Sequence, residues 1–283
     1  METTERLIMA MAEDGVILEG AVFAPVGGQA GAIPIVWLHG MAGHFYTTPF
    51  VNLGRAVAGL GYTFISANNR GHDFGTMVYT PQGQMQMAGS GWELFSESPR
   101  DVAAWVASGA KRGGGKVALA GHSLGALKVA HYLGQRPDER VAGLIVASAP
   151  CAAHRLDPER VKLAEAMVAD GKGMQLLPAA PGPASINTVS ARTLADRAHT
   201  GIDAYGFDTA SAAVTRVTCP ILALYGTKEM AIGGPEALET IERNAVASPR
   251  VETHMVEGAD HSYYGHEQEI AAILAQWVEG LPA

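Results

Sequence analysis

One serine of this chain lies in a short segment that permits very few backbone shapes. The segment is Gly121-His122-Ser123-Leu124-Gly125, and it joins an apolar run at 116–120 to a run with helical spacing at 126–133. Glycines two positions before and after a serine allow a turn too tight for larger side chains, which leaves the serine hydroxyl exposed above the strand. The pattern therefore predicts a strand, a sharp turn with a strained serine, and a helix, in that order.

The rest of the chain alternates between short apolar runs and amphipathic segments. We expect strands at 5–12, 15–23, 33–38, 62–67, 141–147, 221–225 and 251–256, and helices near 50–58, 98–107, 235–246 and 267–278. The first two strands are separated by Asp14-Gly15, a strong hairpin signal. Repeated strand–helix units predict an α/β fold, with a mostly parallel central sheet covered by helices on both faces.

This alternation lapses between about residues 150 and 214. Two helical stretches, near 158–169 and 189–199, flank a Pro- and Gly-rich stretch at 176–183. We interpret 151–214 as a helical cap inserted over the carboxyl ends of the strands, and 1–150 with 215–283 as one core domain. The methionines Met77, Met85 and Met87 lie in a segment that we expect to be a loop packed onto the core, with the lining of an apolar pocket as the alternative.

Composition excludes several classes of function. Hydrophobic residues make up 48% and charged residues 17% of the 283 residues, which suits a globular protein with a large core. The net charge is −8 and the chain has no run of Lys or Arg, which argues against a nucleic-acid partner. The amino terminus resembles neither a signal peptide nor a membrane span. Cys151 and Cys219 are far apart, without the spacing of a metal site or disulfide framework, so we expect a cytoplasmic protein.

Several landmarks occur in the order typical of one family. His39-Gly40 follows one predicted strand, Asn69-Arg70-Gly71-His72 follows the next, and then come the serine segment, the helical insertion, an acidic residue and a late histidine. Over essentially its whole length the chain resembles a capped α/β-hydrolase. The resemblance implies covalent acyl transfer, in which Ser123 attacks a carbonyl, a histidine moves the proton and water releases the acyl group.

The base of such a site follows the last strand, because the order in this fold is Ser, then Asp or Glu, then His. Gly258-Ala259-Asp260-His261-Ser262 matches that loop, so His261 is the expected base. His254 or His266 would replace it if the strand ended elsewhere. His122 lies inside the turn and is expected to point away from the cleft in a structural role.

The acid should follow the preceding strand, where Tyr225-Gly226-Thr227-Lys228-Glu229 resembles the family's Gly-x-x-Asp segment. Glu229 is the expected acid, although it departs from the commoner aspartate and its extra methylene requires a shifted backbone. Asp260 is the alternative, and Asp203 and Asp208 are weaker ones.

Attack on a carbonyl creates an oxyanion that two backbone N–H groups should bind. We expect one from Leu124 and, by analogy with the family, the other from Met41. His39 is expected to support this loop, and Arg70 to be a structural hydrogen-bond donor.

These residues together suggest a serine hydrolase of a carboxylic ester or lactone that uses no cofactor and no metal. The Ala-, Leu- and Pro-rich insertion favours a small-molecule substrate with an apolar portion, and the same composition would suit a homodimer interface. The alternatives are a C–C bond hydrolase, an acyltransferase, hydrolysis of a thioester or amide, and a ligand-binding receptor with vestigial hydrolysis.

Overall fold

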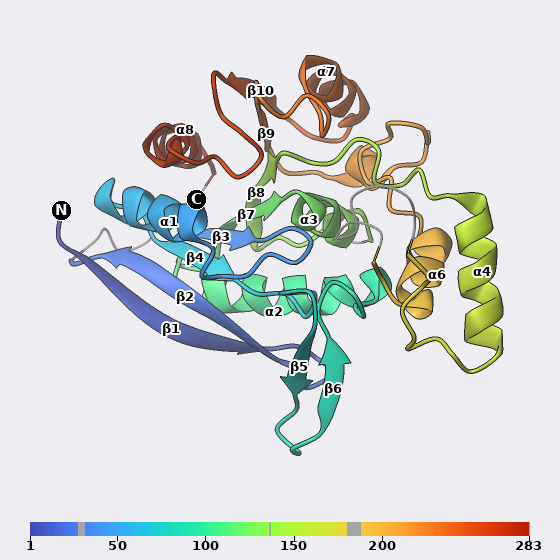
Figure 1. The fold of residues 1–283 in the computed structure, drawn as a ribbon. Helices are drawn as coiled ribbons and strands as arrows, with labels where there is room; N and C mark the ends of the chain where they lie inside the picture. The colour runs from blue at the N-terminus through green and yellow to red at the C-terminus, as the bar shows by residue number, and fades with distance from the viewer. Residues whose placement is uncertain (28–31, 136, 180–187, 283) are drawn as a thin grey trace.

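The computed structural model describes residues 1–27, 32–135, 137–179 and 188–282 and contains one large sheet (Figure 1). Its eight strands are β1 (Thr3–Met11), β2 (Ile17–Pro25), β3 (Ile35–Leu38), β4 (Phe64–Ala67), β7 (Val117–His122), β8 (Val141–Ala147), β9 (Ile221–Gly226) and β10 (Val251–Val256). A separate two-stranded sheet consists of β5 (Thr76–Tyr79) and β6 (Met85–Ala88). The helices are α1 (Thr48–Gly59), α2 (Ser98–Ala110), α3 (Leu124–Gln135), α4 (Pro158–Ala169), α6 (Ala191–Thr200), α7 (Pro235–Asn244) and α8 (Glu267–Glu279), with short 3₁₀ turns η1 (Phe95–Glu97) and η2 (Ala213–Arg216).

The large sheet has the order β1-β2-β4-β3-β7-β8-β9-β10. β1 and β2 form the antiparallel hairpin, β2 pairs antiparallel with β4, and every other neighbouring pair is parallel. All residues of β3, β4, β7, β8 and β9 are buried, because helices cover both faces of a parallel sheet. The predicted fold class is therefore confirmed.

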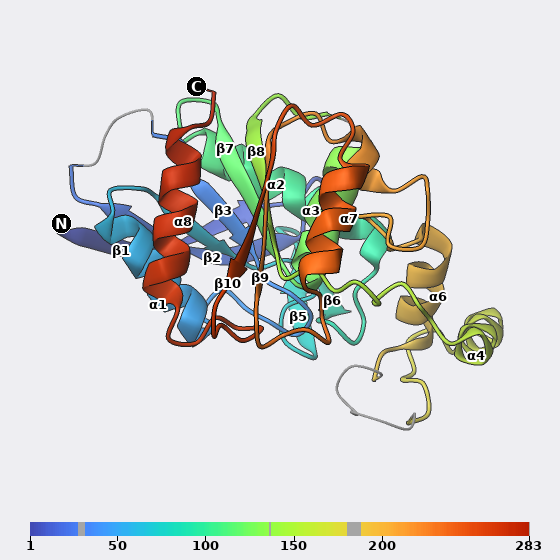
Figure 2. The same cartoon turned by 90° about the horizontal axis from the view of Figure 1, so that it is seen from above.

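Helices cover both faces of the sheet (Figure 2). A layer of apolar side chains holds them on each face. On one face, α1 and α8 pack around Trp37 and Phe64. On the other face, α2, α3 and α7 cover the opposite side chains of the same strands, and Trp105 of α2 is fully buried there. This arrangement leaves the carboxyl ends of the parallel strands at one edge, where ligands bind in open α/β sheets.

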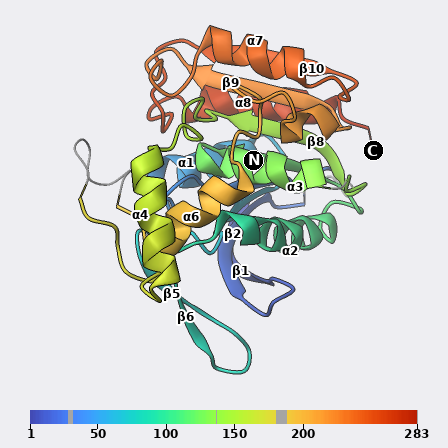
Figure 3. The same ribbon diagram turned by 90° about the vertical axis from the view of Figure 1, so that its right-hand side faces the viewer.

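Residues 151–214 carry α4 and α6, which pack against each other and lie outside the layered core, with α6 against η1 (Figure 3). A small cluster of apolar side chains that includes Ala164, Leu177 and Leu194 joins the two helices. Residues 180–187, which complete the segment interpreted from the sequence as a cap, lie outside the described residues.

The methionine-containing segment differs from the expectation. It forms the hairpin β5–β6, which projects from the body of the molecule in Figure 1, and is not a loop packed onto the core. Met77 and Met87 are each 37% exposed and Met85 is 63% exposed, so the expectation of core packing was wrong. Antiparallel pairing satisfies the backbone of this segment without burial of its side chains, apart from Val78 and Ala88.

Within the described ranges, no helix has both the length and the apolar character needed to cross a bilayer.

Candidate active site

Ser123 is the single residue between the end of β7 and the start of α3. Its φ is +55°, a left-handed conformation that a non-glycine residue adopts at a cost of about 1–3 kcal/mol. The Ser123 N–H donates to the carbonyl of Ala147 on the neighbouring strand at 2.9 Å, which fixes the strained residue to the sheet.

The two flanking glycines are required by close contacts. A Cβ on Gly121 would lie 2.4 Å from the carbonyl oxygen of Gly125, and a Cβ on Gly125 would lie 2.5 Å from the carbonyl oxygen of His39. Real Cβ atoms do not approach backbone oxygens this closely, so only glycine fits at either position. The tight turn expected from the sequence is therefore present.

Three sequence-predicted residues from distant parts of the chain meet at this turn. His261 Nε2 lies 3.1 Å from Ser123 Oγ, and His261 Nδ1 lies 2.6 Å from Glu229 Oε2. Because a carboxylate can only accept, Nδ1 carries the proton and Nε2 is free to accept from the serine hydroxyl. The imidazole thus has the tautomer needed to take a proton from Ser123.

The second oxygen of Glu229 is also fully engaged. Oε1 accepts from the Gly226 N–H and from the Ser148 hydroxyl, each at 2.5 Å, and Ser148 Oγ in turn lies 2.5 Å from the hydroxyl of Tyr263. Glu229 is only 4% exposed. These donors hold the buried carboxylate in one orientation. Glu229, three residues after the end of β9 at Gly226, therefore reaches His261 from the turn that follows this strand.

The sequence analysis did not predict a role for Ser148 or Tyr263, although the position of each in the sequence pointed to the site. Ser148 directly follows a predicted strand at its carboxyl end, and Tyr263 is two residues from the predicted base. Burial raises the pKa of the Tyr263 hydroxyl well above its usual value, so this group remains a neutral donor. The Tyr263 hydroxyl therefore donates to Ser148, whose hydroxyl donates to Glu229; we call these two hydrogen bonds the relay.

His122 supports the base from behind. Its Nε2 lies 2.6 Å from the backbone carbonyl oxygen of His261, and its ring is stacked on Trp37 with a centroid distance of 6.1 Å. Burial lowers the pKa of His122 to about 3, so the ring is neutral and donates this hydrogen bond. A structural role was expected for His122, but its contact with the loop of the base was not.

The loop after β3 lies against the serine. A Cβ on Gly40 would be 2.6 Å from Ser123 Cβ and 3.0 Å from its Oγ, so the backbone of this loop passes directly beside the hydroxyl. Met41 follows in the same loop, and its N–H has no hydrogen-bond acceptor among the described residues. Leu124 begins α3, and the first amides of a helix have no acceptor within it.

Buried His39 fixes this loop. Its Nδ1 lies 2.7 Å from the Gly40 carbonyl oxygen, and its Nε2 accepts from the Asn69 N–H at 3.2 Å. Burial holds the pKa of His39 well below its usual value, which keeps the ring neutral. The ring thus ties the loop after β3 to the loop after β4.

Backbone strain is concentrated at the same edge of the sheet. Among the described residues, five non-glycine residues have positive φ, and each follows a different strand of the large sheet at its carboxyl end: Ala42, Asp73, Ser123, Ser148 and Tyr263. Strained residues persist where the surrounding structure over-determines them, and they cluster at functional sites. The distribution therefore points to this edge as the functional one.

The alternative residues weighed from the sequence have other partners. Asp260 accepts from the amides of Ser262 and Tyr264 and so stabilises a turn. His254 is exposed on β10, and His266 lies 3.1 Å from Glu269 at the start of α8. Asp203 binds successive backbone amides of the loop 206–209, and Asp208 pairs with Arg155 at 2.7 Å.

Arg70 has the structural environment expected for it. Its side chain is 4% exposed and pairs with Asp101 at 2.8 Å and with Glu97 and Asp14, each at 2.9 Å. Within the described residues, no group of three or more His, Cys, Asp or Glu side chains is arranged to hold a metal ion.

The sequence model of the alpha/beta hydrolase family matches residues 35–273, and the chain belongs to this family. Among solved structures, it is similar to Est1E from Butyrivibrio proteoclasticus with ferulic acid bound, at a TM-score of 0.68 and 15% identity over 96% of this chain and 98% of that one. The DcsB complex with its substrate analogue gives a TM-score of 0.70 and 13% identity over 98% and 99% of the two chains. The monoacylglycerol lipase of Paleococcus ferrophilus gives a TM-score of 0.62 and 18% identity over 98% of both chains. No curated protein matches the chain in sequence.

Proposed function

We propose that this protein is a serine hydrolase that cleaves a carboxylic ester, lactones included, through an acyl-enzyme intermediate. The observation that carries the proposal is the hydrogen-bonded series from Ser123 Oγ through His261 to Glu229, with distances of 3.1 and 2.6 Å. A serine activated by a base, with the base oriented by a third group, is the arrangement that nucleophilic acyl transfer needs.

The first half of the reaction forms the acyl-enzyme. Ser123 Oγ bonds to the carbonyl carbon while its proton passes to His261 Nε2, and the carbonyl electron pair becomes an oxyanion. The N–H groups of Met41 and Leu124 would donate to that oxyanion. The ester C–O bond then breaks, and the leaving alkoxide takes the proton from His261 as an alcohol.

The second half regenerates the enzyme. Water attacks the acyl carbon and gives one proton to His261 Nε2, and collapse of the second tetrahedral intermediate returns that proton to Ser123 Oγ. The Glu229 carboxylate accepts the hydrogen bond from His261 Nδ1 and stabilises the imidazolium that forms twice per turnover. The acid product leaves with the oxygen of water, so that all atoms balance.

The known structures favour an ester over other carbonyl substrates. Est1E holds ferulic acid, a carboxylic acid of the kind that ester cleavage releases, and the Paleococcus ferrophilus protein is a monoacylglycerol lipase. In our proposal, residues 151–214 form a cap that contributes apolar side chains to a small-molecule substrate site. This part of the proposal rests on the position of α4 and α6 outside the layered core, with α6 against η1.

Hydrolysis of p-nitrophenyl esters from acetate to octanoate tests the proposal. We expect turnover on at least one chain length and its loss in Ser123→Ala. Ser262→Ala is the matched control, because it removes a hydroxyl beside the base without touching the proposed relay. Equal rates for the wild type and Ser123→Ala on every ester would contradict the proposal.

A further inference from the structure

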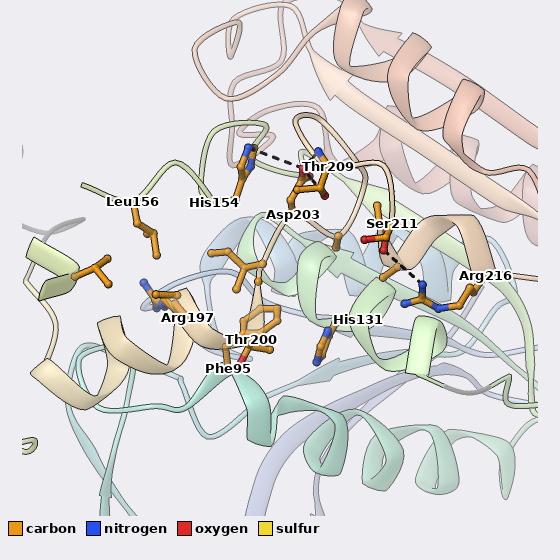
Figure 4. Close-up of a pocket in the computed structure, with 17 residues that line it drawn as sticks. Phe95, His131, His154, Leu156, Arg197, Thr200, Asp203, Thr209, Ser211 and Arg216 are labelled. Atoms are coloured by element: carbon orange, nitrogen blue, oxygen red, sulfur yellow. Dashed lines mark hydrogen bonds and ion pairs between the residues drawn. The ribbon is translucent and has the colours of Figure 1, made fainter. Parts of the chain in front are cut away.

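A hollow separate from the serine site lies between α6, α3 and the loop that leads to η2, and it has a volume of about 480 Å³ (Figure 4). That volume lies within the range of about 300–1,000 Å³ typical of small-molecule sites. Its lining contains none of the proposed catalytic residues, and neither Met41 nor Leu124. We call it the α6 cavity.

The wall of the α6 cavity is mixed in character. Phe95, Leu156, Val161 and Ile202 supply apolar surface, contributed by η1, the segment before α4, α4 itself and the segment after α6. Polar groups lie among them, including Arg197, which Figure 4 labels on the α6 side. An apolar wall with a few polar groups is the usual lining of a site for an organic ligand.

Arg197 is the unusual member of this wall. The side chain is 9% exposed, and its Nη2 lies 3.4 Å from Glu93 Oε1. Its Nε is buried and has no hydrogen-bond partner among the described residues. A buried guanidinium N–H without an acceptor is costly, so the described residues leave part of the hydrogen-bonding capacity of Arg197 unused.

The charge balance around Arg197 favours a negatively charged ligand. Glu93 is shared, because its other oxygen binds the Lys128 ammonium at 2.5 Å, and both of these side chains are 1% exposed. Among these three side chains, Arg197, Lys128 and Glu93, the positive charges exceed the negative ones by one. Buried charges are normally paired, so a single negative charge would complete the group.

The other charged groups of the cavity do not supply that charge. Asp203 lines the cavity, but its carboxylate already accepts from four backbone amides and from the Thr209 hydroxyl. Arg216, at the opposite end of the view in Figure 4, adds a second cation and donates to the carbonyl oxygens of Gly134 and Ser211. Among the described residues, the cavity wall therefore carries two guanidinium groups, and its one lining carboxylate is already engaged by backbone and hydroxyl donors.

We propose that the α6 cavity binds an organic monocarboxylate, with its carboxylate on Arg197 and its apolar chain or ring against Phe95, Leu156 and Ile202. A monoanion matches the one surplus charge, and the apolar wall requires more than an inorganic ion. The site lies apart from Ser123, so its occupation does not depend on the proposed hydrolysis.

Calorimetric titration of Ser123→Ala protein with octanoate and with octanamide, its neutral counterpart, tests the proposal. We expect one octanoate site and ~10-fold weaker binding of the amide, since charge-assisted hydrogen bonds are about twice as strong as neutral ones. Arg197→Gln should lower octanoate affinity by a similar factor. Arg155→Gln is the control, because it removes an exposed arginine outside the cavity.

Two further measurements distinguish the α6 cavity from the serine site and from a folding defect. Ala198→Phe fills the cavity while Arg197 and its ion pair remain, so it should abolish binding even if Arg197→Gln folds poorly. Wild-type protein treated with a fluorophosphonate should bind octanoate as before. Equal affinity for octanoate and octanamide, binding unchanged in Ala198→Phe, or binding lost on blocking Ser123 would each overturn the proposal.

Discussion

Replacement of Glu229 by glutamine removes one negative charge from the site and leaves the volume of the side chain almost unchanged. Oε1 of Glu229 accepts from two donors, the Gly226 N–H and the Ser148 hydroxyl. In the glutamine variant the amide oxygen must remain at that position, because an NH₂ group there would face two donors. The NH₂ group is then directed at His261 Nδ1.

An NH₂ group at 2.6 Å forces Nδ1 to become the acceptor and moves the imidazole proton to Nε2. The ring then presents a donor to Ser123 and can no longer take its proton. In serine proteases the corresponding Asp-to-Asn change lowers kcat about 10⁴-fold through the wrong tautomer, or about 5 kcal/mol of transition-state stabilisation. We expect a loss of similar size for Glu229→Gln.

The assay is the steady-state rate on the best p-nitrophenyl ester, with KM measured separately and folding checked by thermal denaturation. The control is Asp260→Asn, which should retain most activity because Asp260 binds only the amides of its own turn. An active Glu229→Gln together with an inactive Asp260→Asn would refute the assignment of the acid.

Three other variants test the surroundings of the site. His122→Gln should make the free energy of unfolding less dependent on pH below pH 6.5. The pKa of the folded His122 ring is about 3, so between pH 6.5 and 5 only the unfolded chain gains a proton there. In urea unfolding, the wild type should therefore lose about 2 kcal/mol more than the variant over this pH range. Gly40→Ala places a methyl against Ser123 and should lower kcat at least tenfold with a reduced Tm; unchanged kcat would contradict the contact. Ser148→Ala leaves one oxygen of Glu229 with a single donor and should lower kcat about tenfold without changing KM, whereas wild-type kinetics would exclude the relay.

Much of the core architecture could be predicted because its signals are local. The buried parallel strands are short runs rich in Val, Ile, Leu and Ala. The predicted strands 141–147 and 251–256 coincide with β8 and β10. The Gly-x-Ser-x-Gly turn is equally local, since each glycine is required by atoms within a few residues or on the adjacent strand. The helix near 158–169 also coincides with α4.

The parts that escaped prediction depend on distant contacts. The hairpin β5–β6 carries exposed methionines and lacks the alternation of a half-buried strand, so only backbone pairing identifies it. Ser148 and Tyr263 meet Glu229 only because β8, β9 and β10 are neighbours in the sheet. The surplus charge at Arg197 likewise arises from residues on three different segments.

The whole proposed mechanism depends on Ser123 as the reactive nucleophile of this protein. The strictest test is to treat the protein with a fluorophosphonate, digest it and locate the adduct by mass spectrometry. We expect one adduct on Ser123, absent after denaturation before labelling and absent in His261→Ala at the same exposure. An adduct on another serine, such as Ser90 or Ser148, or no adduct on the folded protein, would contradict the mechanism.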